Sequence, residues 1–439
     1  MEGESSWPRL EDVRAQDDRR LVILDDNLSG ISTVYDTNIL LDYSVGAIED
    51  MLMSSEESFF IITNIRSLPE KEASRVIKKI MDNITQVVMR NRYAKPVQIV
   101  SRMDSTLRCH YPAVVSTVQR NVFVGCDSII LAPQVFEGGR VTFNDIHYIE
   151  NLESDEFIPV HMTSYAQDSD FSYGTSHLKE WVIEKSKRSS SKGMDPERVI
   201  SISLHDIREG GALAVQNKLE NAPMHSTVVV NALHDHDMDV FMMGLLLAEQ
   251  NGSQFIYSVG SSFVSSRMGL ARRPPLSTSK LRQMTAGGRG RRAGLLVVDR
   301  GTQHVAEQID HLVERTEAEH VHVVELEAAR ILWAAPRALE ALRTELTHGM
   351  DEALEAGRHV VLAVAPVGSP VEALEGSTSA DKGEDSGADK GNLAQSTVLT
   401  HFVSSVIQGL REPPSFTLTT GGGTAFHVAA HGCGITRGR

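Results

Sequence analysis

The stretch LVILDDNLSG at residues 21–30 joins a run of four apolar residues to two aspartates, an asparagine and a Ser-Gly pair. The apolar run is typical of a strand buried on both faces of a sheet, and Ser29-Gly30 suits the start of a helix. In open α/β sheets, ligands bind beyond the carboxyl ends of such strands. Asp25 and Asp26 could there orient a hydroxyl group or hold a divalent cation. A plain capping loop explains the same residue types equally well, so both interpretations stay open.

The pattern of an apolar run followed by a helix-like segment repeats along the chain. Strand-like runs are predicted at 59–62, 97–100, 128–132, 199–202, 227–230 and 255–258. Helix-like segments are predicted at 69–91, 175–188, 209–221 and 237–250. A second series of strand-like runs lies at 294–298, 320–324, 359–364 and 415–419. Continuous apolar strands that alternate with helices indicate largely parallel sheets covered on both faces, and hence two α/β domains of unequal length.

Composition marks the boundaries of these domains. Residues 1–20 form a polar tail, and residues 271–293 are rich in Pro, Gly and Arg. We interpret 271–293 as a basic linker between a first domain at 21–270 and a second domain at 294–439. Within the second domain, residues 376–392 are rich in Gly, Ser, Asp and Lys and are predicted to form a flexible loop.

The charge balance excludes several classes of protein. The chain has 439 residues, with 43 Lys and Arg against 58 Asp and Glu, which gives a formal net charge of −15. This balance argues against a protein that coats nucleic acid or an anionic membrane. The polar N-terminus is not a signal peptide, and we find no apolar run long enough to cross a bilayer. Cys109, Cys126 and Cys433 are too scattered for a disulfide framework, so we expect a cytoplasmic protein.

The segment RMDSTLR at residues 102–108 follows the third strand-like run. It combines two arginines, one carboxylate and two adjacent hydroxyl groups. An arginine can bind a carboxylate through two hydrogen bonds, and Asp104 can accept hydroxyl protons. This combination suits a site for a polyhydroxy acid, although Asp104, Ser105 and Thr106 could also merely cap a helix.

Two glycine-rich turns follow other strand-like runs. PQVFEGGR at 133–140 places Arg140 beside two glycines that allow a sharp turn or a close approach to a ligand. GGGT at 421–424 lies between a strand-like run and a helix-like segment, an arrangement that directs backbone N–H groups at a phosphate. A simple surface loop and a tight turn are the competing explanations. A Walker A motif does not occur in the chain.

Histidine pairs do not predict a metal site. His234 and His236, with the interleaved Asp235 and Asp237, fit no standard ligand spacing and indicate the start of a helix. His427 and His431 would share one face of a helix, but the glutamate of the metalloprotease motif is missing.

Taken in order, these segments resemble the four-carbon acid sugar kinases. Members of that family carry DDLTGA after the first strand, then KKxDSTLRG, PAFPxGGR and a C-terminal GGxT. The counterparts in this chain begin at Asp26, Arg102, Pro133 and Gly421. Residues 63–67, the Asn231-Ala232 pair and the linker RPPL at 273–276 are further matches. The resemblance extends over essentially the whole chain and implies two Rossmann-like α/β domains with mostly parallel sheets, the second incomplete.

The resemblance implies transfer of a phosphoryl group from ATP, with Mg²⁺, to a hydroxyl of a small sugar acid such as threonate or erythronate. Asp26 and Asp104 would be the catalytic carboxylates, with Asp104 taken as the base. Substrate binding is implied for Asn27, Arg66, Arg102, Ser105, Thr106, Arg108, Gly138, Gly139 and Arg140. Nucleotide binding is implied for Gly421, Gly422, Gly423 and Thr424. No nucleic-acid or membrane partner is expected, and a homodimer stays open.

Several positions depart from the family pattern. Asn27 replaces the second aspartate of the first motif, and Ser101 and Cys109 replace the residues that flank DSTLR. Asp299-Arg300-Gly301-Thr302 stands where the family has a GSxS phosphate loop, and Gly423 replaces an acidic residue. Members also continue to a KSGGFG segment that this chain lacks. The alternative hypothesis is therefore an impaired or truncated relative that binds a small acid or serves as a regulatory protein.

Overall fold

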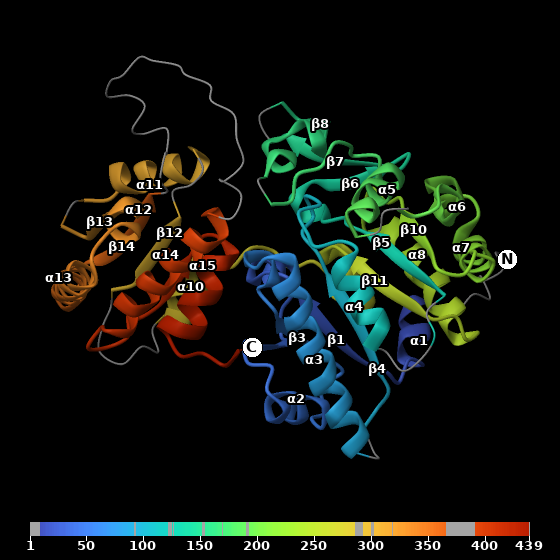
Figure 1. The fold of residues 1–439 in the computed structure, drawn as a ribbon, viewed down its shortest axis with the longest axis horizontal. Coiled ribbons are helices and arrows are strands. Elements are labelled where there is room, and N and C mark those ends of the chain that lie inside the picture. Colours follow the sequence, from blue (N-terminus) through green and yellow to red (C-terminus); the bar gives the residue numbers. More distant parts are fainter. Residues whose placement is uncertain are drawn as a thin grey trace. The chain divides into compact units, whose positions relative to one another are not determined.

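The computed structural model describes residues 9–91, 94–121, 125, 127–151, 154–168, 170–189, 193–285, 293–299, 303–317, 319–365 and 391–438. The chain divides into two compact units (Figure 1). The first consists of Met1–Arg272 together with Arg437–Arg439, and the second of Arg273–Thr436. The fold is mixed α/β with mostly parallel sheets, as the alternation of apolar runs and helix-like segments predicts.

A nine-stranded sheet forms the centre of the first unit. Its strands, in their order across the sheet, are β16 (Arg437–Gly438), β2 (Asn38–Leu40), β3 (Ser58–Ile62), β1 (Arg20–Asp25), β4 (Val97–Arg102), β11 (Phe255–Val259), β5 (Ser128–Ala132), β10 (Ser226–Val230) and β9 (Val199–Ile202). Neighbouring strands are parallel except β16, which pairs antiparallel with β2. The last strand of the chain therefore joins the edge of the first unit's sheet.

Helices cover both faces of this sheet. One face carries α2 (Val45–Leu52), α3 (Glu70–Arg90), α4 (Ala113–Asn121) and α5 (Leu178–Ser189). The other face carries α1 (Leu10–Ala15), α6 (Leu204–Arg208), α7 (Gly211–Glu220), α8 (Asp235–Gln250) and α9 (Ser261–Met268). Val22 and Leu24 of β1 pack in the core on the α3 side, and Ile23 between them is buried on the opposite side. Every residue of β1 is buried, which explains its continuous apolar sequence.

A small antiparallel sheet follows β5. It contains β6 (Arg140–Phe143), β7 (Ile146–Asn151) and β8 (Glu156–Pro159). The sequence pattern did not predict these strands, because few of their residues are buried, namely Val141 and Thr142 in β6 and His147 in β7, and their apolar runs are short.

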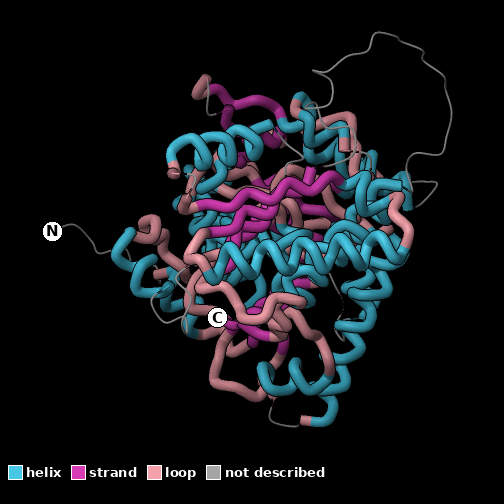
Figure 2. The backbone as a smooth tube through the Cα atoms, turned by 90° about the vertical axis from the view of Figure 1, so that its left-hand side faces the viewer, coloured by secondary structure: helices cyan, strands magenta, loops and turns pink. Residues whose placement is uncertain are grey.

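The second unit is a four-stranded parallel sheet between helices (Figure 2). Its strands, in order, are β13 (Val321–Glu327), β14 (His359–Ala365), β12 (Leu295–Asp299) and β15 (Thr417–Thr419). Its helices are α10 (Thr278–Thr285), α11 (Gln303–Arg315), α12 (Ala328–Leu332), α13 (Pro336–Glu355), α14 (Gly391–Gln408) and α15 (Gly422–His427). Helix α11 packs on one face of the sheet and α12–α14 on the other.

Several sequence-based boundaries differ from the structure. The segment 271–293, interpreted as a linker, contains the helix α10, whereas residues 286–292 lie outside the described residues. The predicted flexible loop 376–392 also lies outside them up to residue 390, and α14 begins at Gly391. Strand β15 is shorter than predicted, since it starts at Thr417 instead of Ser415. Within the described residues, no helix is both long and apolar enough to span a bilayer.

The close approach of α7 and α8 gives a prediction for stability. A Cβ atom at Gly244 of α8 would lie 2.5 Å from the carbonyl oxygen of Ala212 and 2.6 Å from Cβ of Val215. Gly244→Ala should therefore push the helices apart and lower the free energy of unfolding by about 1–3 kcal/mol. Urea denaturation of the full chain measures this loss.

Gly46→Ala, in α2 of the same unit, is the matched control. A Cβ atom there meets nothing within 4 Å. Alanine favours a helix over glycine by up to about 1 kcal/mol, so this variant should be as stable as the wild type or more stable. Equal losses in the two variants would contradict the close-packing explanation.

Candidate functional site

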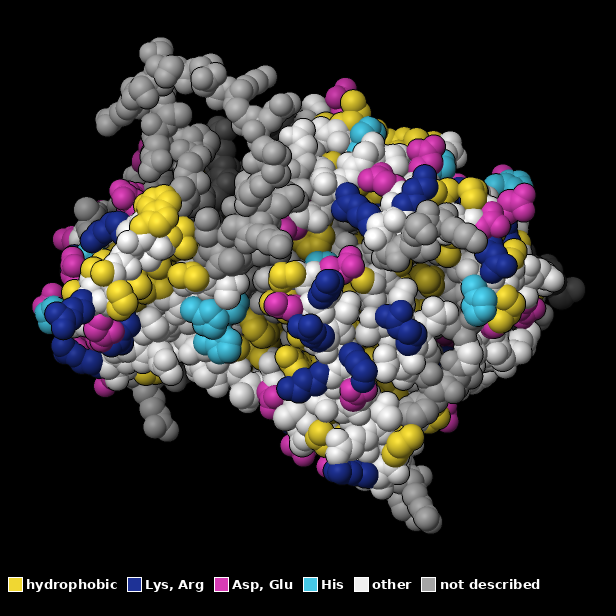
Figure 3. Space-filling model, viewed as in Figure 1, with side chains coloured by type: hydrophobic (Ala, Val, Ile, Leu, Met, Phe, Trp, Pro, Cys, Tyr) yellow, Lys and Arg dark blue, Asp and Glu magenta, His cyan; other side chains and the backbone are white. Residues whose placement is uncertain are grey.

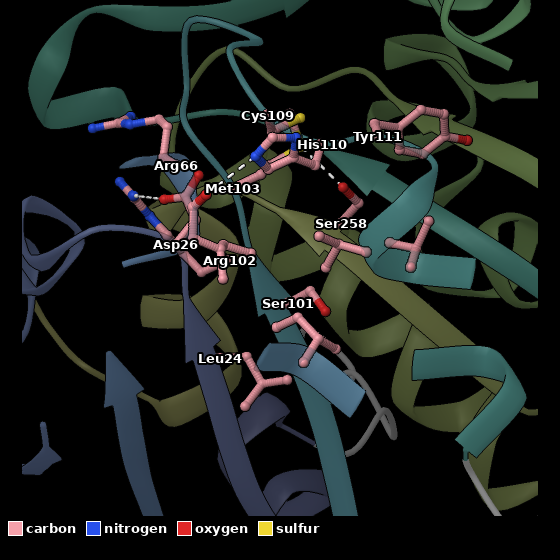
Figure 4. A pocket seen from close by; sticks show the side chains of 14 residues that line it. Leu24, Asp26, Arg66, Ser101, Arg102, Met103, Cys109, His110, Tyr111 and Ser258 are labelled. Carbon is pink, nitrogen blue, oxygen red and sulfur yellow. Dashed lines mark hydrogen bonds and ion pairs between the residues drawn. The ribbon is translucent and has the colours of Figure 1, made fainter. Parts of the chain in front are cut away.

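Three neighbouring strands bring polar loops to one edge of the large sheet. In the parallel register, Asp25 of β1 pairs with Ile62 of β3 on one side and with Arg102 of β4 on the other. The residues that follow each strand therefore emerge side by side, as expected for the carboxyl edge of a parallel sheet. Figure 4 shows the side chains of Asp26 and Arg102 meeting at this edge, with Leu24 and Ser101 deeper along their strands.

Asp104 lies at the centre of a network of hydrogen bonds and ion pairs. Its carboxylate contacts Nη1 of Arg66 at 2.9 Å and Nε of Arg108 at 3.0 Å. The hydroxyl of Thr106 also donates to this carboxylate. The backbone N–H of Asp104 donates to Oδ2 of Asp26 at 3.2 Å. The loops after β3 and β4 thus form one connected group with the carboxylate of Asp26. Its loop members are Arg66, Asp104, Thr106 and Arg108.

Arg102 connects this group to a second aspartate. Its Nη1 lies 3.4 Å from Oδ1 of Asp25 and 3.3 Å from Oδ1 of Asp26, and its Nη2 donates to the hydroxyl of Ser261 at 3.4 Å. The Arg102 side chain is only 7% exposed. The sequence pattern predicts a substrate contact for Arg102, but in this structure its guanidinium group serves as the internal counter-ion of two buried carboxylates.

The three carboxyl groups differ in acidity. Burial raises the pKa of Asp25 to about 7, and the Arg102 guanidinium offsets only part of this effect. Burial also raises the pKa of Asp26, against the opposing charges of Arg66 and Arg102. For Asp104, burial acts in the same direction, but Arg66, Arg108 and the Thr106 hydroxyl outweigh it and lower the pKa to about 2. Asp104 is therefore the firmly ionised member, and Asp25 and Asp26 bind a proton more readily.

Asp25 is a candidate from its place at the strand end, although the family resemblance assigns it no role. It is completely buried, and its Oδ2 has no hydrogen-bond partner among the described residues. Gly30 faces this carboxyl group so closely that a Cβ atom would lie 2.1 Å from Oδ2. The glycine of the first motif is therefore required by the space that Asp25 occupies.

Two side chains from outside the motifs hold the DSTLR loop in place. His147 of β7 contacts the backbone oxygen of Ser105 at 2.8 Å, and the Tyr173 hydroxyl donates to the backbone oxygen of Thr106 at 2.7 Å. Leu107 adopts a left-handed backbone with φ of +65°, which costs a branched residue about 1–3 kcal/mol. Such strain persists where surrounding contacts fix the loop, and these two contacts meet that requirement.

The other predicted substrate residues lie around the network. The Asn27 side chain caps the short 3₁₀ helix at Leu28–Thr33 by accepting from the Ser29 N–H at 3.0 Å. Nη1 of Arg140 donates to the Gly138 carbonyl at 2.6 Å, within its own loop. Gly139 has φ of +66°, so the turn before β6 requires a glycine there. His147 links β6 to the DSTLR loop, since its Nδ1 contacts the Thr142 hydroxyl at 2.9 Å and its Nε2 contacts the backbone oxygen of Ser105.

Two guanidinium groups of the network remain open to solvent. The side chains of Arg66 and Arg108 are 16% and 26% exposed, whereas that of Arg102 is 7% exposed. Arg108 also lies 4.8 Å from the ring centroid of Tyr165 and 3.6 Å from the Asp168 carboxylate. Arg66 and Arg108 are thus the cations of the network that an anionic ligand can reach.

A small cavity lies behind the network (Figure 4). Its volume of about 30 Å³ suits a water molecule or two but is too small for a sugar acid. Apolar side chains such as Leu24, Ile77 and Val114 line its inner part. A larger ligand must therefore approach from the solvent side of Arg66 and Arg108.

The predicted nucleotide residues belong to the second unit. Gly421, with φ of +79°, precedes α15, and Gly422, Gly423 and Thr424 form its first turn. The turn follows the carboxyl end of β15. Residues 300–302, the counterpart of the family's first phosphate loop, lie outside the described residues.

The acidity of Asp25 predicts how stability depends on pH. Its pKa is higher in the folded state than the model-peptide value of 3.8, so the folded chain binds more protons than the unfolded chain between pH 4 and 7. The contribution of Asp25 to the free energy of unfolding should therefore fall as pH rises through this range. Asp25→Asn removes that dependence, so the stability of the variant relative to wild type should rise from pH 4 to pH 7.

Urea denaturation at a series of pH values tests this expectation. Asp50→Asn, a surface carboxylate on α2, is the control that should keep the wild-type pH profile. A difference between Asp25→Asn and wild type that stays constant from pH 4 to pH 8 would show that Asp25 ionises normally in the folded protein.

Comparisons with known proteins agree with this architecture. The family described as "Sugar-binding N-terminal domain" matches residues 21–267, which include every strand end of the network. No curated protein matches the chain. Among solved structures, a Salmonella typhimurium LT2 protein described as a presumed tRNA synthase is similar with a TM-score of 0.61 and 13% identity, over 95% of this chain and 89% of the other.

Two further structures are similar to this chain. A Haemophilus influenzae protein of the family of unknown function DUF1537 has a TM-score of 0.52 and 15% identity, over 95% of this chain and 89% of its own. A Bordetella bronchiseptica DUF1537 protein, a domain-swapped dimer with bound citrate, has a TM-score of 0.40 and 14% identity, over 94% of this chain and 85% of its own. The first two support the fold, and the match over 21–267 shows that this chain belongs to the family with the sugar-binding N-terminal domain.

Proposed function

We propose that the first unit binds a small sugar acid at the Asp26–Asp104 network and that the chain phosphorylates one of its hydroxyl groups with ATP and Mg²⁺. A four-carbon acid such as threonate or erythronate is the proposed substrate. One observation carries the proposal: two buried carboxylates lie beside two arginines that remain partly open to solvent. The description of the matching family as sugar-binding supports the choice of substrate class.

The charges of the network suit an anionic polyhydroxy ligand. The exposed N–H groups of Arg66 and Arg108 can donate to a substrate carboxylate. A guanidinium group binds a carboxylate well because it can form two parallel hydrogen bonds to it. The carboxylates of Asp26 and Asp104 can accept from substrate hydroxyl groups. A neutral sugar lacks the group that the arginines would bind, so an acid should bind more tightly.

We assign the base to Asp26, whereas the sequence-based expectation was Asp104, which no residue-level reason favoured. A general base works best when its pKa lies near the working pH. Asp104 has a pKa lowered to about 2 and is held by two guanidinium groups, so it is a weak proton acceptor. The pKa of Asp26 is raised, and its Oδ2 is held only by the Asp104 N–H among the described contacts. Asp104 then orients the substrate.

The turn at 421–424 is the proposed contact for the nucleotide phosphates. Gly421 allows the sharp turn, and the backbone N–H groups at the start of α15 can face an anion. Gly423 supplies no carboxylate for a metal, so Mg²⁺ would be held mainly by the ATP phosphates, as is usual for this ion. Bound Mg²⁺ would neutralise charge on the transferred group.

An acid-binding protein without kinase activity is the second candidate. The side chain of Asn27, which stands where the family has an aspartate, caps a helix and carries no charge. Together with Gly423, this departure removes two acidic groups that phosphoryl transfer could use. The proposed contacts with the acid group come from Arg66 and Arg108, which both departures leave in place.

Release of ADP in the presence of Mg²⁺ and each four-carbon sugar acid tests the kinase proposal. Turnover should require a sugar acid, and Asp26→Asn, which keeps the shape of the side chain, should lower kcat by about 10²–10⁴-fold. Arg75→Gln, on the exposed surface of α3, is the control and should leave kcat unchanged.

Thermal unfolding with the same acids separates the two candidates. A ligand that binds the folded state raises the unfolding temperature, with or without catalysis. Stabilisation by threonate or erythronate without ADP release would support the second candidate and contradict the first. Neither stabilisation nor turnover with any four-carbon sugar acid would contradict both.

A further inference from the structure

Three histidines converge on one face of the second unit. His401 lies on α14, His427 ends α15, and His431 lies on the π-helical turn at Val428–Gly432. The ring centroids are 5.0 Å apart for His401 and His427, 5.5 Å for His401 and His431, and 5.4 Å for His427 and His431. The largest histidine patch in Figure 3, in cyan, lies over these C-terminal helices. The sequence spacing revealed only two of the three rings.

The backbone beneath the three rings is fixed by packing. Val428 is buried in the core of the second unit together with Phe402 and Val403 of α14. Gly432 approaches α14 so closely that a Cβ atom there would lie 3.4 Å from Cβ of Ile407. The residues adjacent to His401, His427 and His431 are thus held against each other, and the distances between their backbones follow from the fold.

The rings differ in exposure in a way that suits ligation. His427 is only 9% exposed, and its Nδ1 is buried with no hydrogen-bond partner among the described residues. A buried polar nitrogen without a partner is unfavourable, so this atom requires an explanation. His401 and His431 are exposed and can rotate towards it.

We propose that His401, His427 and His431 bind a divalent transition metal ion, with Zn²⁺ as the probe. With Zn–N bonds of about 2.0–2.1 Å and tetrahedral geometry, two imidazole centroids lie about 5 Å apart, close to the three distances observed. Imidazole nitrogens suit Zn²⁺, Cu²⁺ and Ni²⁺ and do not suit Mg²⁺. The site is therefore distinct from any Mg²⁺ that accompanies ATP. Three protein ligands leave the fourth position to water.

Rotation of the exposed rings is needed to bring the three imidazole nitrogens around one metal ion. Among the described residues, the group whose potential ligand atoms already lie within 4.8 Å of one another is Glu317, Glu319 and His320. All three residues of that group are exposed, two of them are acidic, and none has a buried unpartnered side-chain atom. Glu317, Glu319 and His320 are therefore an alternative place where the second unit could bind the metal ion, and a substitution in this group serves as a control.

Metal binding to the full chain, freed of metal by a chelator, tests the proposal. Co²⁺ should give the visible absorption of four-coordinate cobalt at one equivalent, and Zn²⁺ but not Mg²⁺ should abolish it. His401→Ala and His431→Ala alter exposed side chains, so both should fold. Each should raise the Kd for Zn²⁺ by at least roughly 100-fold, because removal of a ligand costs more than removal of its outer hydrogen-bond partner.

His320→Ala and His348→Ala are the controls and should keep the wild-type Kd. His320 belongs to the competing acidic group, and His348 lies exposed on α13 next to Glu352. Zn²⁺ binding that survives in His401→Ala and His431→Ala, that is lost in His320→Ala, or that is absent from the wild type would overturn the proposal. Because the readout needs neither ATP nor a sugar acid, its result is independent of the kinase assay.

Discussion

The burial of three carboxyl groups against guanidinium groups at one edge of the large sheet is the constraint on which the first unit depends. Removing a charged group from water costs several kcal/mol unless an opposite charge and hydrogen bonds replace the water. Asp25, Asp26 and Asp104 are all buried, and Arg66 and Arg102 lie among them. The parallel register of β1 with β3 and β4 is what brings these groups within reach of one another. A shift of register would leave a charge unpaired in the interior.

The same constraint explains why the motif residues are not equivalent. Arg102 neutralises Asp25 and Asp26 inside the protein, whereas Arg66 and Arg108 neutralise Asp104 and still face solvent. One arginine therefore stabilises the folded chain, and the other two are available to a ligand. A sequence motif presents all three as positive charges near a strand end. Their different roles follow from the depth at which each guanidinium group lies.

The sequence predicted the strand ends well because local signals define them. Asp26, Arg66 and Asp104 each follow a strand-like run rich in apolar residues, and parallel strands place such positions together. His147, Tyr173 and Ser261 were missed because they reach the network across 42, 67 and 159 residues of chain. A lone histidine or tyrosine carries no local pattern that reveals such a contact. Likewise His401 lies on a helix far from the His427–His431 pair in sequence, so the spacing rule could not identify the cluster.

The fold of this chain is more widely shared than its sequence. Structures with 13% and 15% identity cover 95% of it, so the α/β framework tolerates replacement of most side chains. What must persist for a common site is the small set of charged residues at the strand ends. Stability and turnover measurements report on these residues indirectly. A structure with bound ligand shows directly which of them contact it.

A crystal structure of the full chain with threonate is the most direct test of the proposed sugar-acid site. We expect the carboxylate of threonate to contact the guanidinium groups of Arg66 and Arg108, and a hydroxyl group to lie within hydrogen-bond distance of Asp26. Threonate bound elsewhere, with the Asp26–Asp104 network unchanged and unoccupied, would contradict the account.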